Sequence, residues 1–183
     1  MENVIQLGEN EVLIFLDIDG VLVTWNSLKF NKSSSKDREL FDKSCVKILN
    51  DVLKKTNCKV IISSSWRIGR SLEDLREIFF KNKIETLPFD KTPPSATGRR
   101  GKEILAWMFN NNINPQEAKF LVIDDEIYDI VPVVELKNIF HVRGSLKTGL
   151  VKKDKKIIFK KINAMLNKKE ITNQNELEIN ESG

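Results

Sequence analysis

The sequence predicts one α/β domain in which a parallel β-sheet is covered by helices on both faces, forming three layers. Short apolar runs alternate along the 183 residues with stretches of helical periodicity, which is typical of β-α-β units. Acidic or hydroxyl side chains directly follow three of these runs, where parallel sheets place their ligands. Hydrophobic residues make up 40% of the chain, which suffices for one core and excludes collagen-like and fully disordered proteins.

Four runs are predicted as strands. The first three are continuously apolar in their centres, which is typical of strands buried on both faces, and the fourth is a shorter apolar stretch. The predicted strands cover residues 12–16, 59–63, 119–123 and 138–142.

Helical patterns lie between these strands. In residues 38–56 the apolar residues recur at steps of three and four, which forms one buried stripe. Ser71 and Asp74 resemble a capping box, so a helix is predicted from there to about Lys83. A third helix is predicted over 102–110. Loops are predicted over 25–37 and 87–101, which are rich in Ser, Asn, Pro and Gly.

The net charge of +4 hides an uneven distribution. Residues 143–169 carry ten Lys or Arg and one acid, whereas the last fourteen residues carry four Glu and no base. The apolar residues of the basic segment 152–169 have helical spacing. This predicts either an ordinary helix with its lysines in water or a surface that contacts nucleic acid or anionic lipid. We expect an ordered domain over 1–166 and a disordered polar tail over 167–183.

The chain carries neither a membrane-spanning run nor a secretory signal core. The longest apolar run near the start covers only residues 12–16 and ends in an aspartate, so we expect a cytoplasmic protein. Cys45 and Cys58 are then expected to be reduced structural thiols.

Two aspartates follow the first predicted strand, in Asp17-Ile-Asp19-Gly20. Successive side chains of an extended chain alternate in direction, so Asp17 and Asp19 are predicted to point to the same side. Two buried carboxylates repel each other unless a cation or a shared proton relieves the repulsion. A calcium loop is excluded because Val21-Leu-Val follows Gly20, where oxygen ligands are required.

The third predicted strand ends in a second acidic cluster, Asp124-Asp125-Glu126. If the first and third strands are parallel neighbours, Asp17, Asp19 and Asp124 converge on one site. Mg²⁺ held by carboxylates and water would resolve their repulsion. For Glu126 the alternative of an acidic helix N-terminus is favoured.

The second predicted strand ends in Ser63-Ser-Ser-Trp-Arg67. Hydroxyl groups together with an arginine suit a phosphoryl group, so Ser63 and Arg67 are predicted to bind substrate. The alternative is a Ser-rich turn with Arg67 in solvent.

These motifs, in this order, resemble the haloacid dehalogenase (HAD) superfamily of phosphohydrolases. More narrowly, the stretches FLDIDGVL, VIISSSWR, GRRGKEILAWM and FLVIDD resemble the HAD domain of bacterial Swiss Army Knife RNA-repair proteins. The resemblance covers roughly residues 11–151. It implies a Rossmann-like sheet, a Mg²⁺-dependent phosphatase and an aspartyl-phosphate intermediate.

The resemblance also implies roles for single residues. Asp17 matches the nucleophile and Asp19 the general acid and base. Ser64 is the first match to the hydroxyl that binds the phosphoryl group, and Ser63 is the second. Asp124 matches a metal ligand, Asp125 a further ligand or its support, and Asp17 and Asp19 complete the expected metal site.

The cation of the third motif is less closely defined. Arg100 is the first match and Lys102 the second, because both lie where the third helix begins. Arg99 is expected to lie in solvent.

Departures from the family bear on the substrate. Many HAD phosphatases carry a cap domain, but residues 24–58 and 68–97 are too short to hold a large one. An open site admits a bulky phosphorylated group, so we expect a phosphorylated macromolecule, either a polynucleotide end or a protein side chain such as phosphotyrosine. Trp25 and Trp66 are candidates for stacking there, although packing at the rim is the favoured interpretation, and a structural role is expected for His141.

The alternative function is a binding module without turnover. It would use the same cleft, together with the basic segment 152–169, to bind phosphate or nucleic acid. The presence of both Asp17 and Asp19 favours the enzyme.

Overall fold

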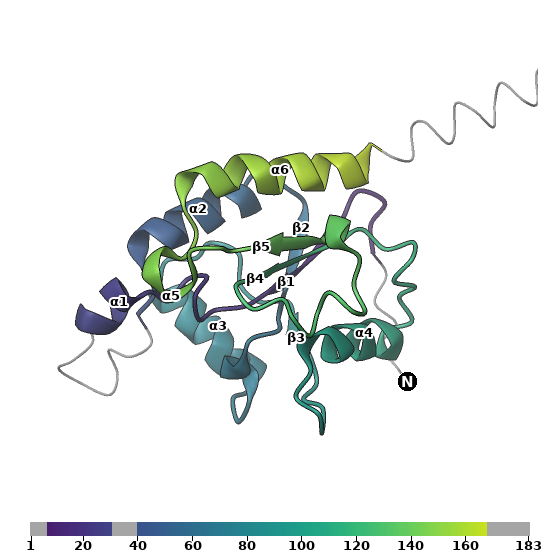
Figure 1. Cartoon of the computed structure of the whole chain (residues 1–183), viewed down its shortest axis with the longest axis horizontal. Helices are drawn as coiled ribbons and strands as arrows, with labels where there is room; N and C mark the ends of the chain where they lie inside the picture. The colour runs from purple at the N-terminus through teal and green to yellow at the C-terminus, as the bar shows by residue number, and fades with distance from the viewer. Residues whose placement is uncertain (1–6, 31–39, 168–183) are drawn as a thin grey trace, which may run out of the picture.

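A five-stranded parallel sheet forms the centre of the molecule (Figure 1). The computed structural model describes residues 7–30 and 40–167. The strand order is β3-β2-β1-β4-β5, and every pairing is parallel. The strands are β1 (Val12–Leu16), β2 (Cys58–Ile62), β3 (Asp90–Lys91), β4 (Phe120–Asp124) and β5 (Ile139–His141).

Helices cover both faces of this sheet (Figure 1). The helices are α1 (Trp25–Phe30), α2 (Lys43–Leu53), α3 (Leu72–Lys81), α4 (Arg100–Asn110), α5 (Ser145–Thr148) and α6 (Lys152–Leu166), with short 3₁₀ turns η3 (Ser65–Arg67) and η4 (Leu136–Asn138). The predicted three-layer α/β fold is therefore confirmed. In the described parts of the intervals that could hold a cap, the chain forms only short helices, turns and the two-residue strand β3.

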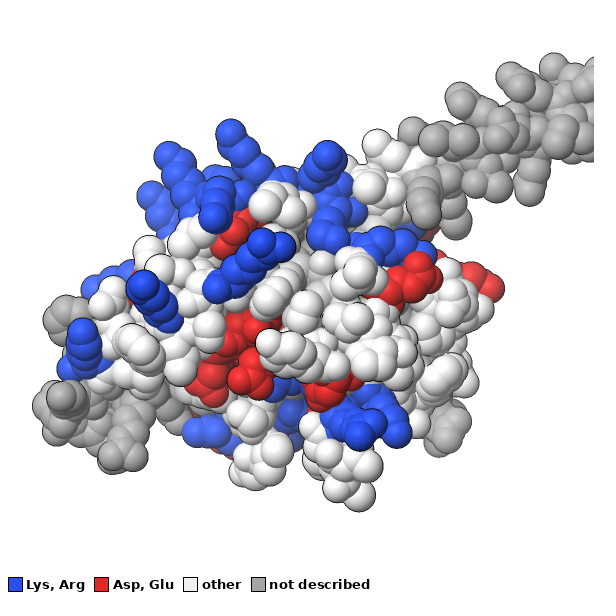
Figure 2. All heavy atoms as spheres, viewed as in Figure 1, with Lys and Arg blue, Asp and Glu red and all other residues white. Residues whose placement is uncertain are grey.

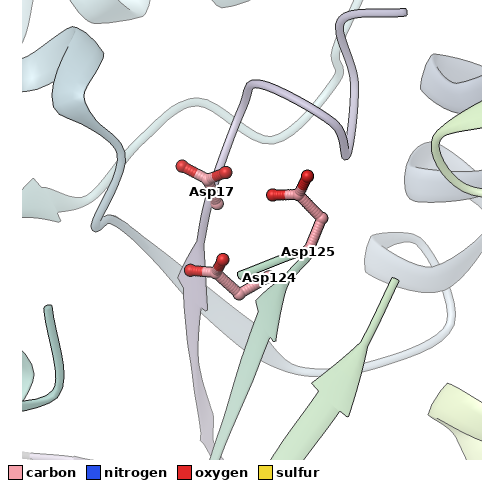
Figure 3. A group of neighbouring side chains, drawn as sticks. All are labelled: Asp17, Asp124 and Asp125. Atoms are coloured by element: carbon pink, nitrogen blue, oxygen red, sulfur yellow. The ribbon is translucent and has the colours of Figure 1, made fainter. Parts of the chain in front are cut away.

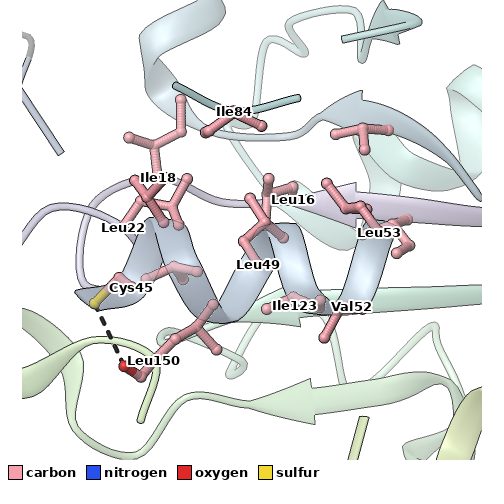
Figure 4. Packing of buried hydrophobic residues seen from close by; sticks show 14 of the residues in the cluster. Leu16, Ile18, Leu22, Cys45, Leu49, Val52, Leu53, Ile84, Ile123 and Leu150 are labelled. Carbon is pink, nitrogen blue, oxygen red and sulfur yellow. Dashed lines mark hydrogen bonds between the residues drawn. The ribbon is translucent and has the colours of Figure 1, made fainter. Parts of the chain in front are cut away.

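Alternation along the buried strands divides the core into two halves. Leu16 of β1 belongs to the half covered by α2 and α6, whereas Phe15 belongs to the half covered by α4. In the first half Leu49 and Val52 of α2 pack over the sheet (Figure 4). Both faces of the central strands are therefore dry, which explains why their sequences are continuously apolar.

The differences from the predicted elements are local. Residues 25–30 form α1 rather than a loop, and β3 lies inside the second predicted loop. The helix predicted from residue 38 begins at Lys43, because the Asp42 side chain caps the backbone N–H of Ser44. The capping box of Ser71 and Asp74 is present as predicted.

The basic segment forms α6, which packs on α2 and β4. Ile158 and Ile162 are buried, whereas Lys152, Lys153 and Lys156 are exposed. In Figure 2, lysine and arginine side chains gather along α6, above a group of acidic side chains in the middle of the same face. The amphipathic interpretation is thus confirmed, and contact with an anionic surface stays a prediction.

Two further expectations concern the tail and the cysteines. The predicted disordered tail lies outside the described residues from 168 onward. Cys45 and Cys58 are free thiols, as expected, and burial raises the pKa of Cys45 to about 12, so that this thiol is unreactive. Among the described residues, no helix combines the length and the apolar character that a membrane span requires.

Candidate active site

Parallel pairing of β1 with β4 brings the two acidic motifs together. Leu16 is in register with Ile123, so Asp17 and Asp124 follow on adjacent strands. One carboxylate oxygen each from Asp17, Asp124 and Asp125 lies within 4.8 Å of the others. The three side chains point toward one another at the carboxyl ends of the strands (Figure 3). The predicted convergence of Asp17 and Asp124 is therefore observed.

The ionised form of this carboxylate cluster is unfavourable in the absence of a bound metal ion. Burial, together with the neighbouring Asp124 carboxylate, raises the pKa of Asp17 to about 7. Burial likewise raises the pKa of Asp124 to about 6, against the opposing effect of Arg100. Among the described residues, Asp17 Oδ1 is buried without a hydrogen-bond partner of good geometry. Arg100 lies near this oxygen, but one guanidinium does not balance three converging carboxylates, which suit a hard divalent cation such as Mg²⁺.

The prediction that Asp19 completes the metal site differs from what the structure shows. Its side chain lies outside the cluster of three carboxylates and accepts a hydrogen bond of 2.9 Å from Trp66 Nε1. The physical reason is that β1 ends at Leu16, so strict alternation does not continue to Asp19. Gly20 then turns the chain with a φ of +69°, a conformation that glycine adopts at little cost.

The two predicted phosphate-binding serines lie directly beyond β2. A hydrogen bond from the Ser64 hydroxyl acts to lower the pKa of Asp17, which places Ser64 beside the proposed nucleophile. Ser64 also caps the turn η3. The Ser63 hydroxyl is buried and has no hydrogen-bond partner among the described residues. The geometry therefore favours Ser64, the first of the two matches.

Arg67 does not occupy the position expected of a substrate ligand. Its guanidinium is buried, forms an ion pair with Glu103, and donates to the carbonyl oxygens of Ser63, Ser64 and Thr92. Because all three of its nitrogens are engaged, we do not retain the predicted role in substrate binding. Arg67 instead holds the backbone of the serine turn.

Arg100 is the cation that reaches the acidic cluster. Its Nη1 lies 2.5 Å from Asp124 Oδ2 and 3.2 Å from Asp17 Oδ1. Burial acts to lower the pKa of Arg100, but the two carboxylates outweigh it and raise the pKa above its ordinary value. Lys102 and Arg99 are both exposed. The first match for the cationic position is thus the one that the geometry favours, and Lys102 is not brought to the site.

Asp125 is held from several directions. Its Oδ2 accepts a hydrogen bond of 2.5 Å from the Ser145 hydroxyl, and its main-chain oxygen lies 3.0 Å from His141 Nε2. A Cβ on Gly20 would lie 2.0 Å from the same Oδ2. His141 thus contacts the backbone of the site, in agreement with the structural role expected for it.

Trp25 and Trp66 differ in position. Trp66 is partly buried, packs edge-on against Phe41 and contacts the Asp19 carboxylate, so it supports the site rather than offering a free ring. Trp25 is 56% exposed at the start of α1. Stacking by Trp25 stays a prediction.

Three supporting residues were not found from the sequence as contributors to the site. Glu103 pairs with Arg67, Asp129 accepts from the backbone N–H of Arg100, and Ser145 donates to Asp125. Their sequence positions gave no signal, because only the folded chain brings them to the site. Trp66 was named from the sequence, but its hydrogen bond to Asp19 was not predicted.

Comparison with family models supports the resemblance seen in the sequence. Residues 13–155 match the family model described as the HAD domain in Swiss Army Knife RNA repair proteins. Comparison with curated proteins gave no match. The chain is also similar to a solved structure described as a predicted phosphatase from Clostridium acetobutylicum, with 14% identity, a TM-score of 0.45, and coverage of 82% of this chain and 98% of that chain. Because the family model covers most of the chain, the chain belongs to the family of HAD domains found in Swiss Army Knife RNA repair proteins.

Proposed function

We propose that the chain is a Mg²⁺-dependent phosphomonoester hydrolase that acts through an aspartyl phosphate on Asp17. The observation that carries this proposal is the convergence of Asp17, Asp124 and Asp125 beside the guanidinium of Arg100. Carboxylates alone would repel a phosphate. With a cation bound and Arg100 adjacent, the same cluster would accept one.

The proposed metal ligands are Asp17, Asp124 and Asp125. When bound, Mg²⁺ would neutralise the charge that the phosphoryl oxygens and the carboxylates bring together. Ser64 and Arg100, which both contact Asp17, would donate hydrogen bonds to the phosphoryl oxygens. The metal thus serves charge compensation, while the chain supplies the reacting groups.

The reaction has two displacements at phosphorus. In the first, an Asp17 oxygen attacks phosphorus, the bond to the leaving oxygen breaks, and Asp19 gives that oxygen a proton. In the second, a water molecule attacks phosphorus while Asp19 takes its proton, and the bond to Asp17 breaks to release inorganic phosphate. Trp66 orients the Asp19 carboxylate for both proton transfers through its indole N–H.

The substrate class proposed is an exposed phosphate on a macromolecule. The described residues form no cap over the strand ends, so a large substrate can approach. The family description refers to RNA repair proteins, and exposed lysines line α6 on the face that carries the acidic group (Figure 2). Both points favour a polynucleotide end over a phosphoprotein as the first substrate to test.

The test is a phosphate-release assay with Mg²⁺. It compares a 3′-phosphorylated oligonucleotide, a phosphotyrosine peptide, a phosphoserine peptide and sugar phosphates. Wild-type protein should release phosphate, Asp17→Asn should not, and borohydride should trap the acyl phosphate at Asp17 as homoserine. Asp51→Asn, which alters an ion pair between α2 and Lys155 of α6, is the matched control and should retain activity. Failure to release phosphate from any substrate would favour the binding module instead.

A further inference from the structure

Ser145 adopts a backbone conformation that is unfavourable for serine. Its φ is +42°, in the left-handed region where a residue with a Cβ is strained and glycine is not. Gly144 precedes it, and α5 begins at Ser145. The backbone conformation of the turn therefore favours glycine over serine at this position. The reason for a serine here must lie in the contacts of its hydroxyl.

The hydroxyl contacts a single carboxylate oxygen of the acidic cluster. Ser145 Oγ donates to Asp125 Oδ2 at 2.5 Å, and Gly20 leaves room for that oxygen where any Cβ would collide with it. The Asp125 carboxylate is thus held between the Ser145 hydroxyl and the Gly20 backbone. A side chain on a loop needs such contacts to keep one orientation.

Main-chain hydrogen bonds fix the segment that carries Ser145 at both ends. The Val142 N–H donates to the Asp124 oxygen at 2.8 Å, and the Leu150 N–H donates to the Val21 oxygen at 3.0 Å. The first hydrogen bond therefore connects the segment to the end of β4, and the second connects it to the loop that follows β1. These two hydrogen bonds consequently place the Ser145 hydroxyl relative to the ends of β1 and β4, where the proposed metal ligands lie.

We infer that Ser145 is a positioning residue that holds the Asp125 carboxylate in the orientation needed to bind the divalent cation. The inference rests on the metal site of the proposed function and adds to it a residue outside its motifs. Removing such a support typically lowers metal affinity by about 10- to 100-fold. Because the backbone is strained at Ser145, a substitution by glycine can remove the hydroxyl without lowering stability. The effect on metal binding can therefore be measured apart from an effect on folding.

The experiment measures Mn²⁺ affinity by titration calorimetry and electron paramagnetic resonance, together with urea unfolding in EDTA. Ser145→Gly removes the hydroxyl and also the strain, so it should unfold at the same or a higher urea concentration, yet bind Mn²⁺ about 10-fold or more weakly. Ser145→Ala keeps the strain and lacks the hydroxyl, and should lose the same affinity. Ser71→Ala, which removes the cap of α3, is the control and should leave Mn²⁺ affinity unchanged while lowering stability.

Each outcome decides the inference. Weaker binding by both Ser145 variants, with stability kept in Ser145→Gly, supports it. Wild-type affinity in Ser145→Gly overturns the positioning role and leaves the proposed function intact. Absence of Mn²⁺ binding by the wild-type protein overturns the metal site itself, and the inference with it.

Discussion

Replacing the proposed nucleophile is expected to stabilise the metal-free fold. The pKa of Asp17 is about 7 in the folded chain, against 3.8 for the free side chain. Each unit of such a shift corresponds to about 1.4 kcal/mol, so ionised Asp17 destabilises the fold by about 4 kcal/mol above pH 7. Asn has nearly the same shape and no charge. Since it also loses contacts made by the carboxylate, we expect Asp17→Asn to gain about 1–3 kcal/mol of unfolding free energy at pH 8.

The sign of the pH dependence follows from the same shift. Because the pKa of Asp17 is higher in the folded state, the folded chain binds more protons than the unfolded chain between pH 3.8 and about 7. The contribution of Asp17 to stability is therefore most favourable below this window and is lost as the pH rises through it. Asp124, whose pKa is raised to about 6, adds to the loss. The slope should be much smaller in Asp17→Asn.

Urea unfolding followed by circular dichroism, in EDTA at pH 5 and pH 8, measures both effects. Asp51→Asn is again the control. Its change in stability should be the same at both pH values, because the hydrogen bond from Lys155 lowers the pKa of Asp51 and the carboxylate is ionised at both. Adding Mg²⁺ should raise the unfolding midpoint of wild-type protein more at pH 8 than at pH 5, because a cation favours the ionised carboxylates. An Asp17→Asn variant that unfolds at the same or a lower urea concentration than wild type at pH 8 would refute the reasoning.

Three further predictions concern residues around the cluster. Gly20→Ala places a Cβ at a φ of +69° against the neighbouring carboxylate, so it should lower the unfolding free energy by about 1–3 kcal/mol and weaken Mn²⁺ binding, both measurable as above. Glu103→Gln leaves the Arg67 guanidinium buried without its counter-charge and should lower the unfolding free energy by about 3 kcal/mol in urea; a loss below 1 kcal/mol would contradict it. Arg100→Met should reduce kcat/KM for the best substrate by about 100-fold or more, whereas Lys102→Met should change it less than about threefold; equal losses would show that the cation was misassigned.

The sheet was predicted well from the sequence because its central strands are short, continuously apolar runs. Runs such as Val12–Leu16 are apolar throughout, and in a parallel sheet buried on both faces the position of such a run is nearly unambiguous. The missed elements have weaker local signals. β3 has two residues and owes its pairing to β2, and α1 begins in a segment whose Ser, Asn and Lys favour a loop.

The positions of the site residues at the strand ends were predicted correctly, whereas those of residues farther along the loops were not. Asp17 and Asp124 follow buried strands, so topology alone brings them together. Asp19 and Arg67 lie beyond strand ends, where turns decide the direction of each side chain. Strict alternation therefore misplaced Asp19, and the cost of leaving a buried guanidinium unpaired directs Arg67 to Glu103 rather than to solvent or substrate.

The motif residues and the residues that support them should respond differently to substitution. The motif residues supply charge, and that charge is unfavourable in the metal-free fold. The supporting residues, among them Trp66, Glu103 and Ser145, fix where the motif residues point. Loss of a motif carboxylate should therefore remove function while preserving or raising stability, whereas loss of Glu103 should lower stability. Ser145 is the informative exception. Its replacement by Gly relieves strain and removes a ligand support at once, so stability and metal affinity should move in opposite directions.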